Sequence, residues 1–227
     1  MRQKNIFTYI SILIINLLLP LSANAQKTTV PIMVNEDSIP LFRGIAVSVD
    51  AVGPVQMMIS DYGQYEAALK VNLKDKYFPV IEIGIGQANH EDEATSIKYK
   101  TSAPFARIGC DFNIAKNKHD IYRIFAGARY AFTSFKYDIS GPDVEDPVWG
   151  TATPYGEKDV KGSYHWIEAL VGVDAKIAGP LRLGWSVRYR SRLAKKSGEI
   201  GDPWYVPGFG KQGGSVLGAT FNITFEL

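Results

Sequence analysis

Cysteine is nearly absent from this chain: Cys110 is the single one in 227 residues. One thiol cannot form an internal disulfide, and a zinc site of the cysteine-rich kind is excluded with it. Histidine is also scarce, and the spacing of His90, His119 and His165 fits no pattern of metal ligands. We therefore expect neither a metal nor a cofactor.

An excess of charge of one sign is missing as well. The first 25 residues contain two basic residues and no acidic one, and the remainder contains 23 of each sign. A formally neutral chain lacks the basic surface that binds a phosphate backbone, so nucleic acid is excluded as a partner.

A long apolar run is missing beyond the N-terminal region, so no transmembrane helix is predicted there. The N-terminus itself has Arg2 and Lys4, a short apolar run over residues 10–19, and small residues up to Ala25. This arrangement predicts a secretory signal peptide over residues 1–25, cleaved after Ala25. A membrane anchor is the alternative, but the run is too short to span a bilayer comfortably.

Period-two alternation of apolar and polar residues is abundant beyond residue 40. In the final stretch, Leu217, Ala219 and Phe221 alternate with small or polar residues. Such alternation predicts strands with one apolar and one polar face. We expect eight of them, over residues 41–51, 64–73, 81–86, 106–114, 122–133, 166–177, 181–193 and 215–227.

The connections between these strands alternate in length. Those after the second, fourth and sixth strands are short, and those after the third, fifth and seventh are long: residues 88–100, 138–163 and 194–214. Short turns on one side and long loops on the other are typical of outer-membrane barrels. The first connection has two interpretations, because residues 52–60 either extend the first strand through a bulge at Gly53-Pro54 or form a loop.

These patterns predict an all-β fold: an eight-stranded antiparallel up-and-down transmembrane β-barrel over residues 41–227, with a polar lumen filled by side chains. Residues 26–40 are polar, carry two prolines, and are expected to form a periplasmic lead-in. Alternation alone also fits a soluble barrel with an apolar cavity. Two features favour the membrane barrel: glycines fall on the charged face, and aromatics such as Tyr65 and Tyr189 lie near strand ends on the apolar face.

Three short segments carry a resemblance to a known family. They are Gln26 directly after Ala25, the run Gly63-Gln64-Tyr65-Glu66, and the run from Tyr77 to Gly84. With the eight alternating strands, the chain resembles the small OmpA/OmpX-type outer-membrane β-barrels, and in detail an uncharacterised outer-membrane barrel family of the Bacteroidota. The resemblance implies an outer-membrane location, contact with outer-membrane lipid, a monomer, and recognition of the C-terminal strand by the barrel assembly machinery. Leu227 departs from the terminal phenylalanine usual in such barrels.

The polar face of the predicted strands carries acids and bases in near balance. Charges removed from water must pair or be hydrogen-bonded, so we interpret this face as a structural salt-bridge network. An eight-stranded lumen is just wide enough to be filled by side chains, which disfavours a conduit. The acids are Asp50, Glu66, Glu82, Asp111, Glu168, Asp174 and Glu226, and the bases are Lys70, Arg107, Arg123, Arg129, Lys176, Arg182, Arg188, Arg190 and Arg192.

The register between the sixth and seventh strands follows from their short connection. A turn of three residues, 178–180, would place Ile177 opposite Leu181. Glu168 then lies opposite Arg190 on the lumen side, and we predict that the two form a buried ion pair.

The loop over residues 194–214 mixes lysines with aromatics. That mixture suits a ligand such as a lipopolysaccharide headgroup, and it also suits an ordinary surface loop. The candidate residues for surface binding are Lys195, Lys196, Trp204, Tyr205 and Lys211.

No catalytic residue is predicted. His165 lies two residues after Ser163, but Glu168 falls on the opposite face of the same strand, so a serine–histidine–acid arrangement is not expected. The expected function is a structural or surface-interaction role in the outer membrane. The alternatives are an enzyme that modifies outer-membrane lipid and a soluble periplasmic barrel that binds a small apolar ligand.

Overall fold

The computed structural model describes residues 39–145, 147–198 and 202–227. The chain divides into two compact units, residues 1–39 and residues 40–227, and all the described strands belong to the second unit. The predicted signal peptide and most of the predicted lead-in lie outside the described residues. No helix in the described ranges is long and apolar enough to cross a membrane.

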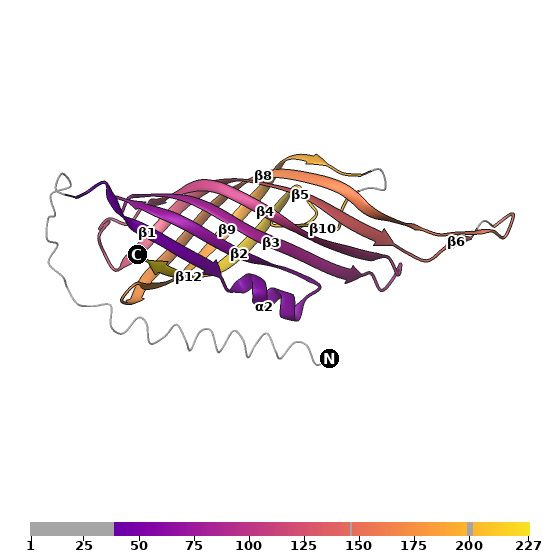
Figure 1. Ribbon diagram of the computed structural model, residues 1–227, viewed down its shortest axis with the longest axis horizontal. Helices are drawn as coiled ribbons and strands as arrows, with labels where there is room; N and C mark the ends of the chain where they lie inside the picture. Colours follow the sequence, from indigo (N-terminus) through magenta and orange to yellow (C-terminus); the bar gives the residue numbers. More distant parts are fainter. Residues whose placement is uncertain (1–38, 146, 199–201) are drawn as a thin grey trace. The chain divides into compact units, whose positions relative to one another are not determined.

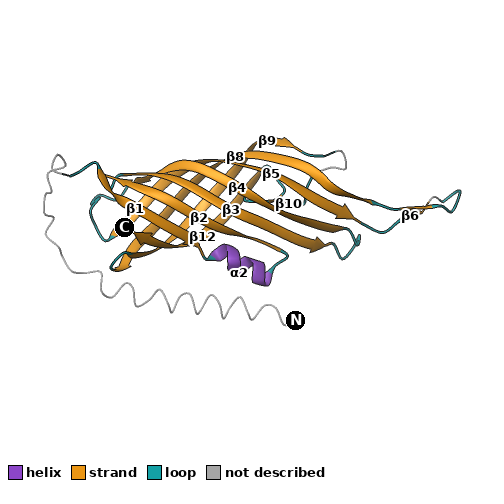
Figure 2. Ribbon diagram, in the orientation of Figure 1, coloured by secondary structure: helices purple, strands orange, loops and turns teal. Residues whose placement is uncertain are grey.

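Eight antiparallel strands form one closed barrel (Figures 1 and 2). Their order around the wall is β1-β12-β9-β8-β5-β4-β3-β2, so barrel strands that follow one another along the chain are also paired, and β12 closes on β1. The predicted all-β fold of eight antiparallel strands is confirmed. The barrel strands are β1 (Phe42–Asp50), β2 (Tyr62–Leu73), β3 (Tyr77–Glu91), β4 (Lys98–Asn113), β5 (Tyr122–Ser140), β8 (Gly156–Ala178), β9 (Leu181–Lys196) and β12 (Ser215–Glu226).

Smaller elements occupy three of the connections. A helix follows β1, one short hairpin lies between β5 and β8, and another lies between β9 and β12. The hairpin between β5 and β8 extends away from the barrel wall (Figure 1). These elements are α2 (Val52–Ile59), β6 (Val144–Glu145), β7 (Ala152–Thr153), β10 (Tyr205–Val206) and β11 (Gly210–Lys211).

Several strands extend beyond their predicted ends on the side of the long connections. The prediction of a long loop over residues 88–100 is wrong, because β3 runs to Glu91 and β4 begins at Lys98. Likewise β5 runs to Ser140 and β8 begins at Gly156, so the loop predicted over residues 138–163 is mostly strand at its ends.

A reversal of polarity explains these longer strands. On β5, Tyr130 and Phe132 are exposed on the wall, whereas the next outward residues are Ser134 and Lys136. The inward side changes in the opposite sense, to Phe135, which is 3% exposed. We call the part beyond this switch the distal zone: residues 87–91, 98–103, 134–140 and 156–164. The part of the wall with apolar outward residues is the apolar belt.

Residues 52–60, which the sequence left open between strand and loop, form helix α2 instead. The Asp50 carboxylate accepts the backbone N–H of Val52 at 3.2 Å and of Gly53 at 2.9 Å, which satisfies donors at the start of the helix. Pro54 is tolerated because it lies in the first turn. The Gly53-Pro54 pair that suggested a bulge therefore marks a helix start.

Candidate functional site

Glutamates and arginines from six strands meet inside the barrel. Period-two alternation turns each of them inward, and closure of the wall brings them together from positions far apart in the sequence. The residues of this lumen network are Glu66 on β2, Glu82 on β3, Arg107 on β4, Arg129 on β5, Glu168 on β8, and Arg188 and Arg190 on β9. All seven were predicted to face the lumen.

Glu82 lies at the centre of the lumen network and is 1% exposed. Its carboxylate oxygens are 2.7 Å from Arg188 Nη1, 3.1 Å from Arg129 Nε and 3.2 Å from Arg107 Nη1. Arginine suits this role because its planar fork donates several hydrogen bonds in fixed directions. A buried carboxylate with three guanidinium neighbours keeps its charge without water.

Glu168 is a second centre of the lumen network. Arg107 Nε lies 2.8 Å from its Oε1 atom, and Trp166 Nε1 donates a hydrogen bond of 2.7 Å to the same oxygen. Arg190 is more distant, with Nε 3.4 Å from Glu168 Oε1. Glu168 and Arg190 are direct neighbours across β8 and β9, as the derived register has them.

The turn that led to this register differs from the predicted one. Ala178, not Ile177, lies opposite Leu181, and the register shifts between Lys176 and Ala178. Ile177 is thus an extra residue in a bulge, and the turn is one residue shorter than predicted. Gly179 makes the short turn feasible because its φ of +51° lies in the left-handed region.

The register that opposes Glu168 to Arg190 also opposes two like charges, Lys176 and Arg182, and the structure keeps these charges apart. The two residues are opposed across β8 and β9, but Lys176 is exposed. Arg182 instead pairs with Asp174 and lies 3.5 Å from Glu226. Glu226 also accepts a hydrogen bond of 2.8 Å from Arg123.

On the side of the lumen network away from the distal zone, the Asp111 carboxylate forms ion pairs with Arg129 at 2.7 Å and with Lys70 at 3.0 Å. Lys70 also lies over the inward ring of Phe125, 5.0 Å from its centroid. A cavity of about 30 Å³ remains at this level, with room for one or two waters. Charged side chains and an inward aromatic ring therefore lie against one another at this level of the barrel.

Asp75 holds the turn between β2 and β3 to the neighbouring turn. It accepts hydrogen bonds from Asn72 at 2.7 Å and from His119 at 2.7 Å, and Arg43 lies at 3.3 Å. Burial raises the pKa of the Asp75 carboxyl, but these hydrogen bonds and the charges of Arg43 and Arg123 outweigh it, so the net pKa is lowered. Sequence reasoning missed this cluster because its members come from two turns and from strands β1 and β2.

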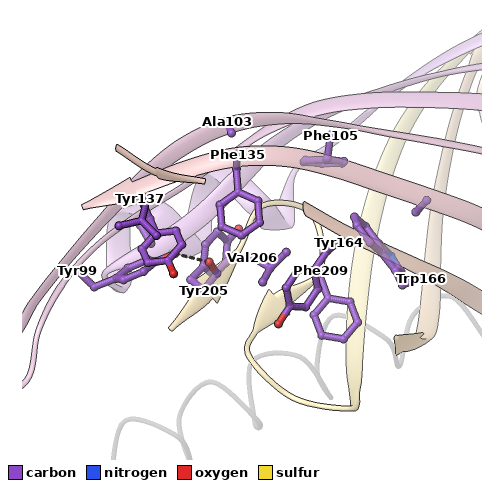
Figure 3. Close-up of a cluster of buried hydrophobic side chains, with 13 residues drawn as sticks. Tyr99, Ala103, Phe105, Phe135, Tyr137, Tyr164, Trp166, Tyr205, Val206 and Phe209 are labelled. Carbon is purple, nitrogen blue, oxygen red and sulfur yellow. Dashed lines mark hydrogen bonds between the residues drawn. The ribbon is translucent and has the colours of Figure 1, made fainter. Parts of the chain in front are cut away.

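The hairpin β10–β11 folds into the lumen, where its side chains pack against aromatic side chains of the barrel strands (Figure 3). Tyr205 and Phe209 are 1% and 0% exposed, and they pack among aromatic residues of the distal zone. The hairpin backbone is held by side chains of the wall: Tyr99 donates to the Tyr205 carbonyl at 2.7 Å and Arg190 Nη1 to the Phe209 carbonyl at 2.9 Å. We call residues 204–211 the plug.

The tip of the plug depends on a glycine. Gly208 has a φ of +80°, and a side chain there would meet the ring of Phe105, 2.4 Å from the Cβ position. Its carbonyl accepts a hydrogen bond of 2.8 Å from Arg107 Nη2. The plug thus contacts the lumen network directly through its backbone.

The burial of the plug corrects part of the predicted surface site. Tyr205 is not on a surface, because its ring lies inside the barrel mouth. Trp204 is half-buried and stacks on His90 with ring centroids 4.0 Å apart, and Lys211 lies over Trp204 at 5.1 Å. Trp204 and Tyr205 therefore anchor the plug to the barrel instead of forming a surface site.

Lys195 and Lys196, the other predicted binding residues, are exposed at the end of β9. Lys195 pairs with Asp202, which also accepts hydrogen bonds from Ser197 and Gln212. The hydrogen bond from Lys195 is the main reason that the pKa of Asp202 is lowered. Lys195 therefore ties the loop to the end of the strand, while Lys196 stays open to solvent.

The remaining predicted residues show no catalytic arrangement. His165 lies on the wall, where its Nδ1 is 2.8 Å from the Tyr130 hydroxyl, while Glu168 points into the lumen. Arg192 is half-buried opposite Trp166. In the described part of the chain, no group of three or more histidines, cysteines and carboxylates is placed to hold a metal ion.

The fold and the site together define a class of protein: an eight-stranded antiparallel β-barrel with a charged interior and an apolar belt on its outer wall. The chain belongs to the family described as "Domain of unknown function (DUF6048)", whose model matches residues 5–227.

Outer-membrane proteins of known structure are similar to this chain. A major outer membrane protein from Thermus thermophilus is 14% identical with a TM-score of 0.42, over 81% of this chain and 98% of that chain. Ail, the attachment invasion locus protein of Yersinia pestis, solved in complex with the heparin analogue sucrose octasulfate, is 9% identical with a TM-score of 0.37, over 81% of this chain and 93% of that chain. A comparison with curated proteins finds no match.

Proposed function

We propose that this chain is an exported outer-membrane β-barrel, of the kind found in Bacteroidota, with a structural or surface-interaction role. In this proposal the lumen is closed by the lumen network at the level of the apolar belt and by the plug at the level of the distal zone. The apolar belt carries the proposal, because it is the feature that a water-soluble barrel would not tolerate.

The apolar belt exposes large side chains on all sides of the barrel. Ile83 is 61% exposed, Val171 57%, Trp185 55% and Leu217 71%, on four different strands. Contiguous apolar surface on this scale is rare on soluble proteins and marks a membrane or partner contact. Where its strands are paired, the closed barrel satisfies its backbone hydrogen bonds within the wall, which is the condition for crossing hydrocarbon with strands.

The polarity switch gives the belt a defined edge. Outward residues change from Phe132 to Ser134 and Lys136 on β5, and from Ile85 to Gln87 and Asn89 on β3. We take this edge as the outer surface of the membrane, so that the distal zone and its loops stand in water on the cell exterior. There the barrel has the ordinary polarity of a soluble protein, with aromatics inside.

Both alternative functions fit this arrangement less well. A soluble barrel for an apolar ligand needs an apolar cavity and a charged exterior, whereas the described lumen has Arg107 at 1% and Glu82 at 1% exposure. A lipid-modifying enzyme needs an acid beside His165 on the wall, and Glu168 lies on the other side of the strand.

The proposed partners follow from the placement in the membrane. Phe221, Ile223 and Phe225 on β12 alternate toward the outer wall, as a strand recognised by the barrel assembly machinery would have them. Outer-membrane lipid surrounds the belt, and the exposed Lys196 is placed to contact lipopolysaccharide headgroups. The barrel needs no second copy to close, which favours a monomer.

Thiol labelling of intact cells tests the proposed placement. The native Cys110 is first replaced by serine, and single cysteines are then introduced at Val171 and Val187 in the belt and at Ser140 in the distal zone. A membrane-impermeant maleimide should label Ser140→Cys and leave the two belt variants unlabelled, because hydrocarbon shields them. All three should label after denaturation in detergent. Free labelling of the belt cysteines in intact membranes would contradict the proposal.

A further inference from the structure

The barrel wall has a gap on the distal side of β1. β1 pairs with β12 only from Asn222 to Glu226, and with β2 only from Ala67 to Leu73. Beyond Asp50 the chain leaves the wall, so residues 215–220 of β12 and residues 62–66 of β2 have no described strand between them. We call this gap the seam.

Helix α2 covers the β2 side of the seam. Gly53 packs so closely that a side chain there would lie 2.1 Å from the Gln64 carbonyl oxygen, and one at Gly63 would lie 2.2 Å from Met57 Cγ. These two glycines fix the helix on β2. A cavity of about 520 Å³ remains between α2, β12 and the plug, within the size range of small-molecule sites.

The outer walls of this cavity are apolar and open toward the belt. Val55 and Ile59 on α2 are 53% and 79% exposed, and Leu217 on β12 is 71% exposed. On β12, Leu217 pairs with Tyr189 of the belt, so this opening lies at the level of apolar outward residues. An entrance with such walls faces hydrocarbon rather than water when the belt is in a membrane.

Two basic residues, Arg190 and Lys211, line this cavity. Arg190 is 7% exposed and lines the cavity, and its Nε has no hydrogen-bond partner in the described residues. Its nearest carboxylate is Glu168, 3.4 Å away and shared with Arg107 and Arg188. Lys211, also in the lining, is exposed and lies over aromatic rings rather than beside a carboxylate of the described chain.

One acid, Asp50, belongs to the same lining. Its carboxylate already accepts backbone N–H groups from Val52 at 3.2 Å, Gly53 at 2.9 Å and Phe221 at 3.0 Å. These three donors hold Asp50 in place at the start of α2 and reduce its effect on the cavity. Of the two basic residues in the lining, Arg190 therefore has only a carboxylate that it shares with two other arginines, and Lys211 is paired with no carboxylate of the described chain.

We propose that the seam binds one anionic lipid of the outer leaflet, with its hydrocarbon chains against Val55, Ile59 and Leu217 and its phosphate beside Arg190 and Lys211. This inference rests on the proposed membrane placement. A lipid fits better than a soluble anion because the entrance is apolar and lateral. The open edge of β12 also offers backbone groups to the ester and hydroxyl groups of a lipid.

Native mass spectrometry of nanodisc-reconstituted barrel tests the inference. The discs contain phosphatidylcholine with a minor fraction of phosphatidylglycerol, and lipids still bound after release into detergent are counted. We expect one retained phosphatidylglycerol per barrel. Lys211→Gln should lower its retention roughly tenfold, the effect of losing one charge-assisted hydrogen bond. Lys116→Gln, which removes an exposed lysine from a turn at the other end of the barrel, is the matched control and should retain it fully.

A second variant and a competitor separate the sources of binding. Ala219→Trp fills the apolar side of the seam without removing a charge, and it should abolish retention. Retention that is equal for both lipids, or unchanged in Lys211→Gln and Ala219→Trp, would overturn the inference. So would displacement of the lipid by an equal concentration of soluble glycerol phosphate, since the seam would then be a plain anion site. Gel mobility with and without boiling reports insertion separately: a barrel that never folds into the discs refutes the proposed function itself.

Discussion

Replacing Glu82 by glutamine is expected to lower the free energy of unfolding by about 3–5 kcal/mol, the usual cost of breaking a buried ion pair from one side. The carboxylate of Glu82 lies within 3.2 Å of Arg107, Arg129 and Arg188, and the side chain is 1% exposed. Glutamine keeps the shape but removes the charge, so three buried guanidinium groups lose a common partner. Urea titration in detergent micelles, followed by gel mobility without boiling, measures the loss.

The same strand supplies the control. Glu91 pairs with Lys98 at 3.5 Å, with both side chains more than half exposed. Glu91→Gln should therefore change the free energy of unfolding by less than about 1 kcal/mol. If Glu82→Gln were no more destabilising than Glu91→Gln, the lumen network would not be the structural element inferred from its geometry.

Truncating Phe209 to alanine is the second change with a large expected effect. The ring is 0% exposed and contacts Trp166 edge-on at 5.7 Å and Tyr164 at 6.0 Å. Loss of a buried phenylalanine lowers the free energy of unfolding by about 3–5 kcal/mol when the site cannot collapse. Release of the plug from the lumen requires less free energy than unfolding of the barrel. We therefore expect the loop that carries the plug to become sensitive to protease added outside the cell, before the barrel itself unfolds.

Limited proteolysis of intact cells distinguishes these outcomes. Tyr155→Ala is the matched control, because it removes an aromatic ring that is 37% exposed in the connection between β7 and β8. Cleavage of the loop between β9 and β12 in Phe209→Ala, but not in Tyr155→Ala or the wild type, is the expected result. Equal resistance of all three would show that Phe209 does not hold the plug.

The sequence predicted the architecture because alternation is a local signal. Each strand of the apolar belt can be recognised within a few residues, as Leu217, Ala219 and Phe221 show on β12. The same alternation predicted which charged residues face the lumen, and it also predicted that Glu168 lies opposite Arg190. The predicted register between β8 and β9 agrees with the structure although the predicted turn was wrong, because the bulge at Ile177 compensates for the shorter turn.

The distal zone was missed because its alternation has the opposite sign. In the belt the apolar residues point outward, but beyond the switch residues such as Tyr99 and Tyr137 point inward. A search for strands whose apolar residues all face outward stops at that switch. The remaining strand residues are then interpreted as a polar loop. In the proposed placement, the environment outside the wall changes from hydrocarbon to water at this switch.

The plug and α2 could not be derived from local pattern. The aromatics of residues 204–209 lie between glycines and prolines, as they would in an exposed loop, and only the ring of distal-zone aromatics explains their burial. Helix α2 has eight residues, too few for a clear helical period, and Asp50, whose carboxylate accepts its first backbone N–H groups, is the last residue of a strand.

Planar bilayer recording of the purified wild-type barrel tests most directly whether the chain forms a membrane-spanning barrel with a filled lumen. Insertion is verified in the same sample by gel mobility without boiling. We expect no stable conductance steps, because the lumen network occupies the cross-section at Glu82 and the plug covers it. Large, long-lived channels from inserted wild-type barrels would contradict this result and require a lumen open to water.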